Sequence, residues 1–73
     1  MKYYLVSYLV FENREVVENS RVGIPLHHFA NTRDFKMMIT KLRDKVRNPS
    51  SIVINSYKEV SMEQFNFETN ARA

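Results

Sequence analysis

The sequence predicts an α+β domain of order ββαβ, in which a three-stranded antiparallel sheet carries one amphipathic helix on one face. Two segments rich in β-branched and aromatic residues precede a run of apolar residues at helical spacing, and a third such segment follows it. Because consecutive strands tend to be neighbours, the third strand can return antiparallel beside the first, which gives the sheet order 2-1-3. With 73 residues, the chain has room for one domain.

The first two predicted strands form a hairpin. Residues 2–11 and 16–24 are dominated by strand-forming types, and the polar residues 12–15 separate them. Asn13 tolerates the left-handed backbone conformation that a tight connection requires. Gly23 and Pro25 close the second strand, and a connecting loop extends to residue 30.

The helix is expected to begin near Asn31 or Thr32, either of which can cap it, and Asp34 suits the positive end of its dipole. Asn48-Pro49 is expected to end it, because the residue before proline disfavours helical geometry. The apolar stripe that should pack on the sheet consists of Phe35, Met38, Ile39, Leu42 and Val46.

The last part of the chain contains the third strand and a polar end. Residues 51–60 carry the apolar run of the strand, and residues 61–64 resemble one capped helical turn. Residues 66–73 are polar enough that we expect a flexible tail. The expected domain therefore covers residues 1–65, with a tail at 66–73.

Composition restricts how this domain can be stabilised and where it is located. Cysteine is absent, which removes disulfides and thiolate zinc sites and suits a reducing compartment. No apolar stretch approaches the length of a membrane span, so we expect a cytoplasmic protein with no membrane partner. A core this small commonly needs unusually good packing or self-association.

The first strand has apolar residues on both faces, and one helix can cover only one of them. We therefore expect the side that carries Tyr4, Val6, Tyr8 and Val10 to be an exposed contact surface for another protein or for a second copy of the chain. An alternative is that the loop 25–30 and the tail fold over this face through Phe29, Phe65 and Phe67. Stacking of exposed nucleic-acid bases on Tyr4 and Tyr8 is a further alternative, for which the sequence lacks a supporting motif.

Positive charge is concentrated in the predicted helix. The net charge of the chain is +3, and residues 33–47 hold six basic and two acidic residues. A solvated face that shields the apolar stripe is one interpretation. Contact with nucleic-acid phosphates is another, as is capture of an anionic nucleotide between subunits. The residues concerned are Lys36, Lys41, Arg43, Lys45 and Arg47.

Catalysis and metal binding have little support in the sequence. His27 and His28 are the two histidines, and neighbouring residues of an extended segment point to opposite sides. No third ligand lies nearby, and nucleophile-elbow, glycine-rich phosphate-loop and paired-carboxylate motifs are absent. We therefore expect a protein that is not an enzyme and that has no cofactor and no metal.

Two segments, residues 1–8 (MKYYLVSY) and residues 51–63 (SIVINSYKEVSME), resemble a set of short uncharacterised proteins of bacteriophages and other mobile elements. The resemblance covers about 25 residues. The middle of the chain, in which Gly23 is the only glycine, departs from the glycine-containing second strand of that set. The resemblance implies an accessory role in a phage or mobile element. We therefore expect stoichiometric binding to a host protein, such as inhibition of a defence or regulatory factor, and a homodimer.

Overall fold

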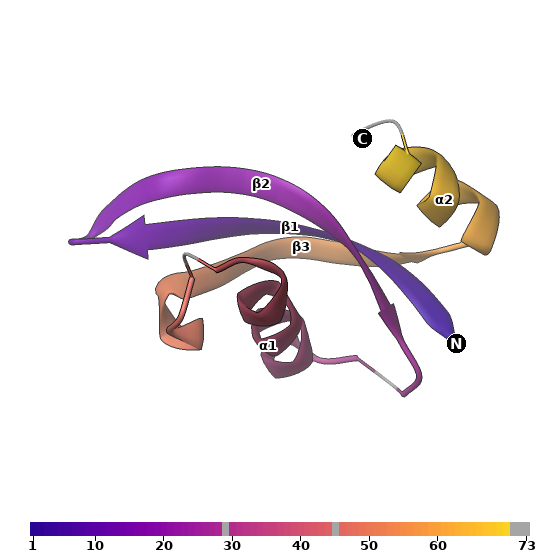
Figure 1. The fold of residues 1–73 in the computed structure, drawn as a ribbon, viewed down its shortest axis with the longest axis horizontal. Helices are drawn as coiled ribbons and strands as arrows, with labels where there is room; N and C mark the ends of the chain where they lie inside the picture. The colour runs from indigo at the N-terminus through magenta and orange to yellow at the C-terminus, as the bar shows by residue number, and fades with distance from the viewer. Residues whose placement is uncertain (29, 45, 71–73) are drawn as a thin grey trace.

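The computed structural model describes residues 1–28, 30–44 and 46–70, and its centre is a three-stranded antiparallel sheet (Figure 1). The strand order is β2-β1-β3, which confirms the predicted α+β class and the order 2-1-3. A second helix, α2, extends the predicted ββαβ order. The elements are β1 (Lys2–Glu12), β2 (Glu15–Leu26), α1 (Thr32–Leu42), the 3-10 turn η1 (Pro49–Ser51), β3 (Ile52–Val60) and α2 (Met62–Asn70).

The β1–β2 hairpin turns through two residues in the left-handed region. Asn13 has φ 53° and Arg14 has φ 67°, and Glu12 pairs with Glu15. Two central residues of positive φ are typical of the type I′ turn, whose twist matches that of the flanking strands. Two residues further on, β2 carries a bulge at Val17, so that Phe11 pairs with Val16 while Val10 pairs with Glu18.

Helix α1 begins as predicted and ends earlier than predicted. The Asn31 side chain accepts a hydrogen bond from the Asp34 backbone N–H at 3.0 Å, which caps the helix. The helix ends at Leu42, because Arg43 has an extended backbone and directs its guanidinium to Glu18 on β2. The predicted continuation to residue 47 is therefore wrong, although Val46 still reaches the core from the segment after the helix.

The core lies between α1 and one face of the sheet. The rings of Tyr4 and Phe35 meet edge to face at 5.3 Å, and Phe35 and Ile39 of α1 are fully buried. The residues of β1 on this side are the four that we expected to form an exposed contact surface, and that prediction is wrong. They are at most 8% exposed: Tyr4, Val6, Tyr8 and Val10.

Cross-strand partners explain why α1 packs on this face. Tyr4 lies opposite Ile24 of β2, and Tyr8 and Val10 lie opposite Ile54 and Ile52 of β3. Side chains that face each other across an antiparallel ladder share one side of the sheet. Three strands together therefore give this side a large apolar area, which the amphipathic helix covers.

The chain end is more ordered than the sequence suggested. Ser61 caps α2 by accepting a hydrogen bond from the Gln64 backbone N–H at 3.1 Å, as the resemblance to a capped turn implied. The helix then continues to Asn70. The prediction of a flexible tail is wrong for residues 66–70, and residues 71–73 lie outside the described part of the chain.

Candidate functional site

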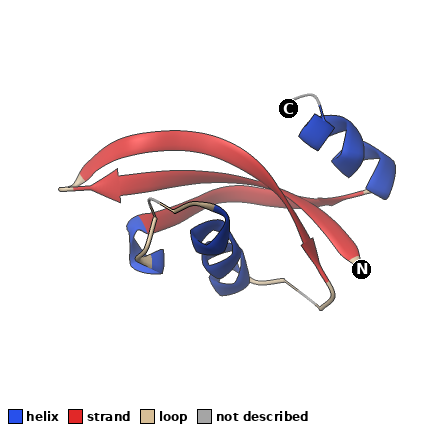
Figure 2. Ribbon diagram, in the orientation of Figure 1, coloured by secondary structure: helices blue, strands red, loops and turns tan. Residues whose placement is uncertain are grey.

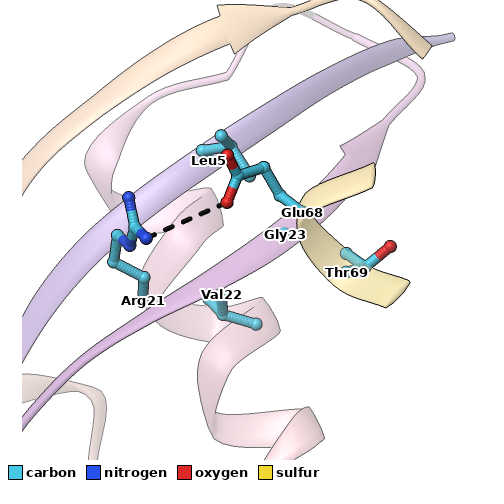
Figure 3. A pocket seen from close by; sticks show the side chains of 6 residues that line it. All are labelled: Leu5, Arg21, Val22, Gly23, Glu68 and Thr69. Atoms are coloured by element: carbon cyan, nitrogen blue, oxygen red, sulfur yellow. Dashed lines mark ion pairs between the residues drawn. The ribbon is translucent and has the colours of Figure 1, made fainter. Parts of the chain in front are cut away.

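Helix α2 lies on the side of the sheet opposite α1, at the end where β1 begins (Figure 2). Phe65 packs on Tyr3, with ring centroids 4.9 Å apart. Close by, Arg21 and Glu68 form an ion pair at 3.9 Å beside a small pocket lined by Gly23 and Thr69 (Figure 3). Phe65 thus covers part of the Tyr3 side of the sheet, whereas the alternative placed it over the Tyr4 side together with Phe29 and Phe67. Phe67 is 69% exposed, and Phe29 lies outside the described residues.

Among the helices of the described part of the chain, none covers the hairpin end of that same face (Figure 1). Leu9 lies opposite Val53, and Phe11 lies opposite Val16. Val16 and Val53 are 50% and 45% exposed, and Leu9 and Phe11 are half-buried. These four residues form an uncharged surface that we call the apolar strip: Leu9, Phe11, Val16 and Val53.

A polar network joins the core to the end of α1. The Tyr8 hydroxyl donates a hydrogen bond to Glu18 at 3.0 Å, and the Arg43 guanidinium donates to the other oxygen of the same carboxylate. Burial raises the pKa of the Tyr8 hydroxyl, and its hydrogen bond to Glu18 raises it further. The network satisfies the hydroxyl of a tyrosine that is 1% exposed, so we assign it a structural role.

The basic residues do not gather on one face of α1. Lys36 and Lys41 lie on the helix, whereas Arg43 and Arg47 follow its end. Arg43 pairs with Glu18, and Arg47 is exposed beside the hairpin end of β1. Helix α1 therefore carries Lys36 and Lys41 but neither Arg43 nor Arg47, and Lys45 lies outside the described residues.

The histidine pair adjoins an open hollow between β2 and α1. His27 and His28 are both exposed, and Asp34, Met37 and Met38 contribute to the same hollow. Within the described residues, no three histidine or carboxylate side chains are grouped closely enough to hold a metal ion. In the same part of the chain, no helix combines the length and apolar character needed to cross a membrane.

Comparisons with known proteins found no matching family model, no matching curated protein and no matching solved structure.

Sequence reasoning missed the apolar strip because it judged the two faces from β1 alone. Residues of β1 are apolar on both faces of the strand. The β1 sequence therefore does not show on which face the neighbouring strands add further apolar side chains. The signal that could have found the strip is in the other strands. Val53 lies between Ile52 and Ile54 in β3, so alternation alone places it on the face opposite the core. Ser56 and Lys58 join that face only because of the register shift between Ser7 and Tyr8, which alternation does not predict.

Proposed function

We propose that the protein is a non-enzymatic binding protein that acts by stoichiometric contact with another protein through the apolar strip. The single observation that carries the proposal is the strip itself, an uncharged apolar surface at the hairpin end of the sheet face opposite α1. Contiguous exposed apolar residues on a small domain mark interaction sites. A rigid sheet also loses little conformational entropy when a partner covers it.

The character of the strip favours a protein partner. Leu9, Phe11, Val16 and Val53 carry no charge, whereas a nucleic-acid surface requires cations along the path of the phosphates. The resemblance to phage and mobile-element proteins directs the proposal to a host protein, with inhibition of a defence or regulatory factor as its expected consequence. A second copy of the chain is the alternative occupant, since small cores are often completed by self-association.

The test compares Leu9→Asp with Met37→Asp. Leu9 lies in the strip, and Met37 is an apolar residue of α1 that is 45% exposed and lies outside it. Wild type and Met37→Asp should capture the same host protein from a lysate at a one-to-one ratio, and Leu9→Asp should lose it. Light scattering then identifies the occupant, because a mass twice the 8.7 kDa of one chain, lost in Leu9→Asp alone, indicates a homodimer. The proposal would be refuted if wild type, Met37→Asp and Leu9→Asp were all monomers and either captured the same host protein equally or captured none.

A further inference from the structure

The outer edge of β2 is open for pairing. Within the described residues, β2 pairs with β1 on one side and with no strand on the other. The bulge at Val17 and the proline at position 25, which has no N–H, bound an uninterrupted stretch from Glu18 to Ile24. The edge of a sheet is where another extended chain can add as a strand by backbone hydrogen bonding.

A hollow of about 320 Å³ lies beside this stretch. Leu42, at the end of α1, lines it and is 56% exposed, although it belongs to the stripe that was expected to pack on the sheet. Val22 and Ile39 add apolar surface to the same hollow.

Arg43 gives the hollow a cationic group with hydrogen-bonding capacity to spare. Its guanidinium has five N–H groups, and among the described residues it donates one hydrogen bond, to Glu18. Its Nε is buried and has no partner in that part of the chain, so an added group would meet the rest of the side chain, which is 38% exposed as a whole. Because an arginine guanidinium can pair with a carboxylate through two parallel N–H groups, an added carboxylate is the complementary group.

We propose that an extended peptide segment of a partner protein binds along Glu18–Ile24 as a fourth strand. Alternate side chains of an added strand face the same side of the sheet. Two peptide residues at positions i and i+2 therefore lie over the end of α1. One of these is apolar and covers Leu42, and the other is Asp or Glu and pairs with Arg43. This inference is independent of the apolar strip, which lies on the other face of the sheet.

The experiment selects from a library of random nine-residue peptides displayed on yeast, with the intact wild-type protein as bait. Enriched peptides should share an apolar residue and an acidic residue two positions apart. Leu42→Asp should weaken their binding about tenfold or more, from the loss of one buried leucine side chain. Met37→Asp, at a similarly exposed apolar residue of the same helix, should bind as wild type does.

Two N-methylated versions of one selected peptide test whether the backbone pairs as a strand. In an added strand only alternate N–H groups bond to β2, so methylation of one alternate set should abolish binding and methylation of the other should preserve it. Equal effects of the two versions would overturn the inference, as would a failure to enrich any peptide. Loss of binding in Leu9→Asp instead of Leu42→Asp would place the peptide on the apolar strip, which overturns this inference and leaves the proposed function standing.

Discussion

Replacement of Gly23 by alanine tests the contact that holds α2 against the sheet. Gly23 does not have a positive φ, so its backbone accepts alanine, but the new Cβ would lie 2.8 Å from Phe65 Cε2 and 2.8 Å from Thr69 Cγ2. In open space the substitution would stabilise the fold by about 0.4–1 kcal/mol, because it reduces the entropy of the unfolded chain. Overpacking costs about 1–3 kcal/mol. The clash should therefore win, with a net loss of about 1–2 kcal/mol.

Urea denaturation followed by circular dichroism measures this loss, and hydrogen exchange of the α2 amides locates it. The matched background is Phe65→Ala with Thr69→Ser, which removes both clashing atoms and keeps the Thr69 hydroxyl that bonds to the Phe65 carbonyl. In that background Gly23→Ala should be neutral or stabilising. If Gly23→Ala also stabilises the otherwise wild-type protein, the close approach of α2 to β2 is refuted.

Three further outcomes follow from the hairpin, the polar network and the two sheet faces. Arg14→Gly should raise the free energy of unfolding by about 1 kcal/mol in a urea titration, because glycine adopts the left-handed conformation without a Cβ penalty, whereas Arg14→Ala should not stabilise the protein. Because the pKa of Tyr8 is raised, the folded state keeps a proton that the unfolded state loses near pH 10, and the free energy of unfolding should fall as the pH rises past 10. Tyr8→Phe should flatten that part of a curve of stability against pH. Tyr8→Asp should abolish the cooperative thermal transition because it buries a charge in the core, whereas Leu9→Asp should retain it. The reverse result would mean that the apolar strip and the core face have been exchanged.

Features set by neighbouring residues were predictable from the sequence. Asn31 caps α1 as expected, and Asn13 takes the left-handed conformation expected of the hairpin turn. Both depend on a side chain acting within a few residues of its own backbone. The sheet order followed from chain connectivity, which also needs no knowledge of the core.

Features set by distant residues were not predictable. The end of α1 depends on Arg43, whose side chain reaches Glu18, a residue 25 positions earlier in the chain. Helical spacing continues past this point to Val46, so the pattern alone favours a longer helix. The extent of α2 likewise depends on Phe65 meeting Tyr3 and Gly23. Polar residues 66–70 have a weak local preference, and tertiary packing decides their structure.

We expected an uncovered sheet face because one helix can cover only one side of a three-stranded sheet. In the structure, the uncovered apolar surface lies on the other face and is smaller than expected. A strand with apolar residues on both sides is ambiguous until its neighbours are aligned, because a shift of one residue exchanges the faces. Ile24, Ile52 and Ile54 resolve the ambiguity in favour of the Tyr4 side, since all three lie in register with core residues of β1. Helix α2 then covers part of the other side near Tyr3, and the apolar strip lies at the hairpin end of that side. The candidate interface is therefore smaller than a whole sheet face, and it lies where neither helix covers the sheet.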